Sequence, residues 1–198
     1  MDYDYDFFIL LSGEDLFIDN GAGLTAYLER NHDKSIIDCR VDHSLSWRIL
    51  SYNLFTDSIF SRSLFVRGVN FFIRKCIYPL IKKSDFKKEQ VFVGSSWLTL
   101  TRKHVAMIVR DFDSNYISKF RFSSCSDEHI FQMWAMQNIH KEIINGTIHF
   151  FSFSKGASNP KYLTMDDINK IKSESEFFFV RKVSGDMAIE YEESNELC

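Results

Sequence analysis

The chain is 198 residues long, and its composition is that of an ordinary folded domain, with 45% apolar and 26% charged residues. These fractions exclude global disorder, because a chain of this length and hydrophobicity can bury a packed core. The formal net charge of -3 excludes a general nucleic-acid-binding protein, which would carry an excess of positive charge.

Short apolar runs that alternate with helical patterns predict an α/β domain. Residues 5–11 (YDFFILL) are apolar on both faces of a strand, which is typical of a strand buried inside a sheet. A helix is expected near 21–30 and a second strand over 34–39. The patterns around 45–55 and 68–83 are helical.

The middle of the chain continues the alternation. Residues 90–101 are rich in β-forming side chains and predict a strand or hairpin. Residues 102–112 predict a helix with one apolar face, which consists of Val105, Ile108, Val109 and Phe112.

Three further elements are expected toward the C-terminus. One helix covers 126–138 with Ser126 as its N-cap, and another follows Thr164, with Asp167 at the capping-box position. The apolar run 177–180 predicts a strand that leads directly into Arg181 and Lys182. Strand alternation would point these two side chains to opposite faces.

Charge and cysteine placement indicate the compartment. The ends of the chain are acidic, and residues 184–198 form an acidic C-terminal tail beyond a domain over 1–183. Residues 67–88 are basic, with seven Lys and Arg against Asp85 alone, and would contact an anionic inner-membrane surface if they are more than a solvated face. The four cysteines lack CxxC spacing, and neither a signal peptide nor an apolar span is visible, so we expect a cytoplasmic protein, soluble or peripheral.

Two acids and a histidine stand at the expected start of a helix, Asp127, Glu128 and His129. The free N–H groups and the dipole there favour negative charge, so a carboxylate suits the role of general base. The alternative is that both acids merely complement the helix dipole.

Isolated cations occur in structured settings between 155 and 182, notably Lys161 after Pro160 and Lys182 after Arg181. A departing nucleotide diphosphate needs such fixed cations or a divalent metal. Each lysine alone also fits an ordinary surface charge. Acidic pairs with metal-ligand spacing are Asp2/Asp4/Asp6 and Asp111/Asp113, a spacing that chance produces easily.

The order of the segments is more informative than any one of them. LSGEDLFI, GSSWLTLTRKHV and SDEHIFQ, followed by NPKYLT and FFFVRKV, resemble the core-2/I-branching β-1,6-N-acetylglucosaminyltransferase family, which is also similar to peptide O-xylosyltransferases. The resemblance extends from Tyr5 to Lys182. It implies a glycosyltransferase A-type fold, inversion at the anomeric carbon and no metal or other cofactor.

The same resemblance implies roles for individual residues. Glu128 would be the catalytic base, and Lys161 and Lys182, with Arg181 beside them, would bind the diphosphate of the donor. Acceptor-binding positions match Asp38, Glu14, Asp15, Phe151 and Phe153. Family members have further strands and helices ahead of the segment that begins here at Asp4, so the resemblance implies an N-terminally truncated chain without part of the nucleotide-binding sheet.

We therefore expect an inverting, metal-independent transferase that moves a sugar, N-acetylglucosamine from UDP-N-acetylglucosamine, to a glycan or glycolipid in bacterial polysaccharide assembly. A first alternative is an inactive remnant that binds carbohydrate or a partner. A second is a metal-dependent transferase that uses Asp111 and Asp113.

Overall fold

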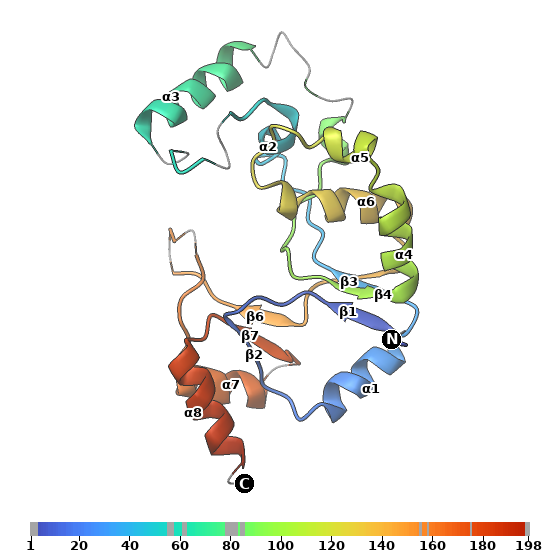
Figure 1. The fold of residues 1–198 in the computed structure, drawn as a ribbon, viewed down its shortest axis with the longest axis vertical. Helices are drawn as coiled ribbons and strands as arrows, with labels where there is room; N and C mark the ends of the chain where they lie inside the picture. The colour runs from blue at the N-terminus through green and yellow to red at the C-terminus, as the bar shows by residue number, and fades with distance from the viewer. Residues whose placement is uncertain are drawn as a thin grey trace.

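The α/β class is confirmed by a computed structural model, in which helices surround two small mixed sheets (Figure 1). The structure describes residues 4–54, 58–60, 63–77, 83, 86–154, 156–157, 159–174 and 176–196. Among the helices that it describes, none combines the length and the apolar character needed to cross a membrane.

The first sheet has the strand order β1 (Phe7–Ile9), β4 (Thr99–Thr101), β3 (Ser35–Ile37) and β5 (Ile143–Asn145). β4 runs antiparallel to both of its neighbours, and β3 and β5 are parallel. Helices α4 (Arg102–Asp111) and α6 (Ile130–Asn138) cover one face of this sheet. The core beneath them centres on Trp134, which is 1% exposed, with Ile37 and Leu98.

β1 does not lie inside its sheet, so the prediction of a strand buried on both faces is wrong. It pairs with β4 along one edge, and no other strand within the described part of the chain pairs with its outer edge. Phe8, Leu10 and Leu11 are exposed, whereas Ile9 packs against the core. The apolar run therefore marks an edge strand with one uncovered face.

The second sheet has the order β2 (Asp15–Phe17), β7 (Phe179–Arg181) and β6 (His149–Phe151). Helices α7 (Met165–Glu174) and α8 (Gly185–Glu196) pack with it around Ile168 and Val180. α8 occupies most of the segment predicted as an acidic tail, and Tyr191 of α8 is buried in this core.

Two predicted details of helix structure have different outcomes. The capping box of α7 is confirmed: the Asp167 amide donates to Thr164 Oγ1 (3.2 Å), and the Thr164 amide donates to an Asp167 carboxylate oxygen (3.1 Å). The apolar face of α4 is only partly right, because Val109 is 76% exposed. The covered stripe is centred on His104 and Ile108, and Val109 lies beyond its margin.

The two sheets are joined by a shared core and by helix α1 (Ala22–Arg30), which begins where predicted. Ile36 of the first sheet and Phe179 of the second belong to the same buried cluster, and Tyr27 of α1 packs against it. Gly21 precedes the helix with φ 87°, a conformation that side chains other than glycine rarely adopt.

The remaining helices lie beyond α6, at the top of Figure 1. They are α2 (Trp47–Leu50), α3 (Leu64–Phe72), which continues as a π-helical turn (Ile73–Ile77), a 3₁₀ turn (Lys88–Gln90) and α5 (Ser114–Ser118). The helix predicted near 45–55 is therefore shorter than expected, and the one predicted over 68–83 begins earlier, at Leu64. Residues 78–82 of that prediction lie outside the described residues.

Candidate functional site

Three segments meet at Gly94: the chain after β3 at Asp38, the loop Gly94–Trp97 ahead of β4, and the 3₁₀ turn Ser126–Glu128. The Gly94 amide donates to the Glu128 carbonyl (2.9 Å). A Cβ atom at Gly94 would lie 1.7 Å from the Asp38 carbonyl oxygen. Only glycine therefore allows the Asp38 segment and the turn of Glu128 to approach this closely.

Glu128 carries a half-exposed carboxylate that forms an ion pair with Arg48 of α2. The helix expected to begin at Ser126 begins at Ile130 instead, and Ser126 forms no capping hydrogen bond. Glu128 thus stands on the 3₁₀ turn that precedes α6. The positive group that faces it is the Arg48 guanidinium rather than the helix start that the sequence suggested.

Asp38, one of the predicted acceptor-binding residues, lies next to this turn. Its carboxylate accepts a hydrogen bond from the Ser95 amide (3.1 Å) and pairs with Arg40 (3.2 Å). Ser96 donates its hydroxyl hydrogen to Asp127 (2.9 Å). Asp38 and Glu128 therefore belong to one cluster, in which their backbones meet at Gly94 and each carboxylate has its own partners.

A second cluster forms where β2 and β7 pair, with Asp15 opposite Arg181. Arg181 pairs with Asp15 and with Glu14, both at 3.2 Å, and Lys182 Nζ lies 2.9 Å from the same Glu14 oxygen. Arg181 and Lys182 therefore converge on one carboxylate, and the prediction that they point to opposite faces is wrong. The alternation does not extend to Lys182 because β7 ends at Arg181.

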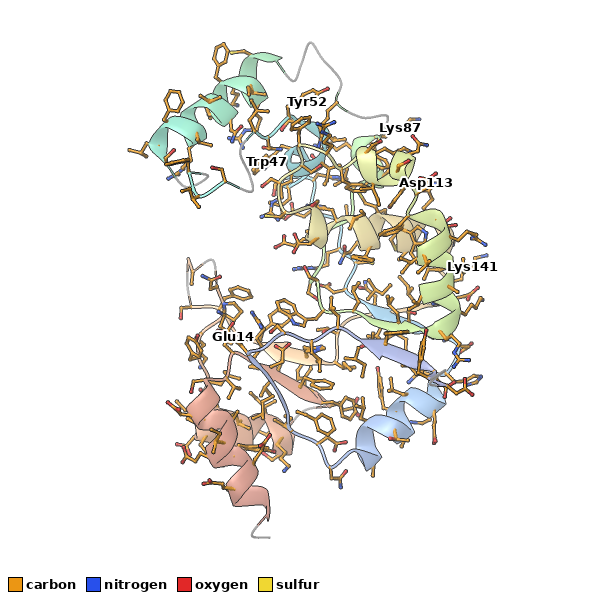
Figure 2. The ribbon with its side chains drawn as sticks, viewed as in Figure 1. Glu14, Trp47, Tyr52, Lys87, Asp113 and Lys141 are labelled. Atoms are coloured by element: carbon orange, nitrogen blue, oxygen red, sulfur yellow. The ribbon has the colours of Figure 1, made fainter. Side chains whose placement is uncertain are left out.

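Glu14 is the centre of this second cluster. It also accepts a hydrogen bond from the Tyr162 hydroxyl (2.7 Å). The hydrogen bonds from Lys182 and then Tyr162 hold the pKa of the Glu14 carboxyl below its usual range. In Figure 2, Glu14 lies at the end of the second sheet, below Trp47 of α2 in the view.

Trp97 connects the two clusters. It follows Ser96, which contacts the turn of Glu128, and its indole N–H donates to Asp15 (3.2 Å). The Arg181 guanidinium lies 4.7 Å from the centre of the Trp97 ring, a cation–π contact. Adjacent residues of one loop thus tie the proposed base to the cationic cluster.

An aromatic row extends from Trp97 through the predicted acceptor-lining residues. The Phe151 ring lies 5.7 Å from that of Trp97, and the Phe153 ring lies 5.9 Å further along, edge to face. Phe153 is exposed. Flat, exposed rings of this kind can stack on the apolar face of a sugar.

Lys161 is only partly brought into the second cluster. The Lys182 amide donates to the Lys161 carbonyl (3.4 Å), so the two backbones are neighbours. The Lys161 ammonium, however, pairs with Asp167 at the start of α7 (3.3 Å), whereas Lys182 pairs with Glu14. The two cations predicted to share one diphosphate therefore have different partners in this structure.

The Asp111/Asp113 pair of the metal-dependent alternative has other contacts. Asp111 accepts hydrogen bonds from Arg110 and from the Trp134 indole, and Asp113 caps α5. Asp2 of the other acidic set lies outside the described residues. Among the residues that are described, no three His, Cys, Asp or Glu side chains form a group that could hold a metal ion.

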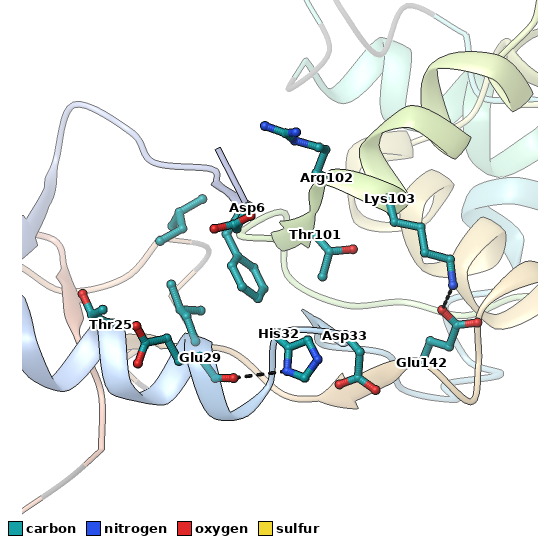
Figure 3. A pocket seen from close by; sticks show the side chains of 12 residues that line it. Asp6, Thr25, Glu29, His32, Asp33, Thr101, Arg102, Lys103 and Glu142 are labelled. Carbon is teal, nitrogen blue, oxygen red and sulfur yellow. Dashed lines mark hydrogen bonds and ion pairs between the residues drawn. The ribbon is translucent and has the colours of Figure 1, made fainter. Parts of the chain in front are cut away.

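A cavity of about 700 Å³ lies away from both clusters, between β1, α1 and the start of α4 (Figure 3). Charges of both signs line it, and two of them pair with each other. Lys103 pairs with Glu142, and Arg102 pairs with Asp4 outside the cavity. It contains none of the predicted site residues.

Sequence reasoning missed three residues of the two clusters. These are Arg48 against Glu128, Trp97 between the clusters, and Tyr162 on Glu14. The available signals were indirect: Arg48 follows Trp47 on a short helix, and Tyr162 is adjacent to Lys161.

The model of a family described as Core-2/I-Branching enzyme matches residues 1–175, which include every predicted site residue except Arg181 and Lys182. No curated protein gives a significant match.

Proposed function

The chain belongs to the core-2/I-branching enzyme family of glycosyltransferases, and on this premise we propose that it is an inverting, metal-independent transferase. The mixed α/β fold agrees with the glycosyltransferase A-type domain of such enzymes. The activity class is transfer of a sugar from a donor to an acceptor. We infer that the donor is UDP-N-acetylglucosamine and that the acceptor is a hydroxyl of a glycan or glycolipid in bacterial polysaccharide assembly, in the cytoplasm.

One observation supports this proposal most strongly: the loop Gly94–Trp97 joins a half-exposed carboxylate to a cationic cluster. Glu128 supplies the carboxylate, and Arg181 and Lys182 supply the cations. A single-displacement transferase needs a base and a site for negative charge on the two sides of the reacting carbon. The two clusters provide these two groups.

In the proposed reaction, the Glu128 carboxylate removes the proton from the acceptor hydroxyl as that oxygen attacks the anomeric carbon. The bond from this carbon to the donor diphosphate breaks, and the configuration inverts. The electron pair of the breaking bond remains on the diphosphate, which leaves as UDP. Glu128 releases the proton to solvent after the product departs.

Lys182 and Lys161, with Arg181, would neutralise the charge on the leaving diphosphate. Their present partners are carboxylates of Glu14 and Asp167. Donor binding would replace some of these pairs, because an ammonium has three donors and a diphosphate carries the greater charge. Asp38 and the aromatic residues Phe151 and Phe153 would then contact the acceptor sugar.

Calorimetric titration with UDP in the presence of a chelator tests this proposal. We expect binding that survives the chelator and weakens at least about tenfold in Lys182→Ala, with a smaller loss in Lys161→Ala. Lys141→Ala is the matched control, since Lys141 is an exposed lysine at the right-hand side of Figure 2, away from Glu14. Glu128→Gln should still bind UDP but should not transfer sugar.

The second candidate is a carbohydrate-binding protein without transferase activity. The exposed Phe153 at the end of the aromatic row favours it, because such a row can bind a glycan without any donor. A folded chain that binds oligosaccharide but not UDP would establish this candidate and refute the transferase.

A further inference from the structure

Helix α3 presents its apolar face to solvent rather than to the core. Leu64 is 83% exposed and Phe65 is 78% exposed, and Phe71 and Phe72 on the same side of the helix are also exposed. Ile59, in the turn before the helix, is 90% exposed. Contiguous exposed apolar surface of this kind marks a site of interaction.

The opposite face fixes how the helix is oriented. Val66 and Ile73 are buried, and Asn70 forms two hydrogen bonds with the backbone of Leu54, at 2.8 and 2.9 Å. These contacts hold α3 against the protein by its inner side. The outward direction of Leu64, Phe65 and Phe72 is therefore set by the fold. In Figure 1, α3 stands apart from both sheets.

The charge around this face identifies its partner. The sequence from 58 to 84 contains six Lys and Arg residues and no acid. Among these cations, Arg67 and Lys75 are exposed. Apolar side chains flanked by cations match the boundary of an anionic bilayer, where phospholipid head groups lie next to acyl chains. A second copy of the chain would fit poorly, because pairing of two such faces would bring like charges together.

We infer that α3 and the turn before it form an interfacial membrane anchor, which inserts Leu64, Phe65, Phe71 and Phe72 into an anionic phospholipid bilayer. The sequence had indicated only an electrostatic contact through the basic residues of 67–88. The structure adds an outward apolar face, which strengthens the contact by burial of hydrocarbon.

The anchor is in contact with the element that faces the proposed base. The Arg74 guanidinium lies 4.5 Å from the centre of the Trp47 ring, and the next residue, Arg48, pairs with Glu128. An acceptor glycolipid in the same bilayer would therefore lie on the side of the molecule where α2 meets Glu128. This last step rests on the proposed function, whereas the anchor itself does not.

Vesicle flotation without donor or acceptor tests the anchor. We expect the wild-type chain to bind vesicles that contain phosphatidylglycerol and to bind pure phosphatidylcholine vesicles at least about tenfold less. Leu64→Ser/Phe65→Ser/Phe72→Ser should lose at least about tenfold in binding to the anionic vesicles. The matched control is Val109→Ser/Ile117→Ser/Ile189→Ser, which removes three exposed apolar residues from other helices and should bind like the wild type.

A second measurement locates the inserted face. Relative to the wild-type chain with its three native tryptophans, Phe65→Trp should add a blue-shifted emission that brominated lipids quench, whereas Val109→Trp should add none. Equal vesicle binding by the two triple variants would overturn the inference. So would a wild-type chain that ignores vesicles but is oligomeric, if the α3 variant becomes monomeric, because the face would then bind protein. UDP titration of the α3 variant separates these results from a failure of the proposed function.

Discussion

The Arg48 guanidinium lies against the Glu128 carboxylate, so helix α2 supplies the cation that faces the proposed base. The backbone reinforces this relationship, because the Ser124 amide donates to the Arg48 carbonyl (2.9 Å). Arg48 therefore holds both the loop before Glu128 and the carboxylate itself. We assign it a positioning role rather than a role in proton transfer, since it acts through the carboxylate that it contacts.

Replacement of Arg48 by alanine should lower kcat by about tenfold to a hundredfold, because a base that is free to rotate loses part of its catalytic effect. UDP affinity should not change, because Arg48 is not part of the cationic cluster at β7. Arg48→Lys should restore part of kcat, since it keeps the charge but not the planar fork. Weaker UDP binding with an unchanged kcat would contradict this assignment.

Gly94 is the residue on which the geometry of the first cluster depends most directly. Gly94→Ala would place a Cβ atom 1.7 Å from the Asp38 carbonyl oxygen, so the backbone must move. We expect a loss of about 3 kcal/mol in the free energy of unfolding, and hence a Tm lower by about 6–12 °C for a chain of this size. Urea and thermal unfolding measure both quantities.

Gly185→Ala is the control for that experiment, since a Cβ atom at Gly185 meets nothing within 4 Å. It should leave the free energy of unfolding within about 0.5 kcal/mol of the wild-type value. Similar losses in the two variants would show that the close approach at Gly94 relaxes easily.

The features that the sequence predicts correctly are local. The capping box of α7 joins Thr164 to a residue three positions away. Helix α1 follows Gly21, whose positive φ is needed for the turn before the helix. The site depends on distant pairs instead. Arg48 and Glu128 are 80 residues apart, and Glu14 and Arg181 are 167 apart. No local pattern specifies which of several cations will face a given acid.

The errors have physical causes of the same kind. Residues 5–11 have the apolar character of a buried strand, but burial depends on what pairs with the strand, and β1 lies at an edge. Alternation assigned Arg181 and Lys182 to opposite faces, but it applies only while the strand continues. The β-propensity and the hydrophobic period describe the segment itself, whereas the strands and helices that pack around it decide which of its faces is covered.

His149 should make the fold sensitive to acid. Its side chain is 1% exposed and stacks on Phe179, with ring centres 4.9 Å apart. Burial lowers the pKa of His149 from 6.5 to about 4. The nearby Asp15 raises this pKa and Arg181 lowers it, each by a smaller amount. Between pH 6.5 and about 4 the unfolded chain binds a proton that the folded chain does not. Stability therefore falls as the pH decreases through this range, by roughly 3 kcal/mol at most from this residue.

His149→Phe tests this acid sensitivity, because phenylalanine keeps the stacked ring but cannot be protonated. Urea unfolding at pH 7 and pH 4.5 should show a smaller loss of stability in the variant than in the wild type. His129 is also buried with a lowered pKa, so part of the loss should remain. His140→Gln, at an exposed position, should lose as much stability as the wild type. Parallel losses in all three proteins would refute the role of His149.

Glu14 pairs with both Arg181 and Lys182, so it competes with any anion that approaches these cations. Glu14→Gln removes this charge and should tighten UDP binding by about threefold, the modest effect expected of a partly exposed ion pair. The wild-type affinity should approach that of the variant as the pH falls and Glu14 becomes protonated, below its usual pKa range. Calorimetry at pH 7 and at lower pH measures both effects. An unchanged UDP affinity with a raised acceptor KM would instead place Glu14 in the acceptor site, where the family resemblance put it.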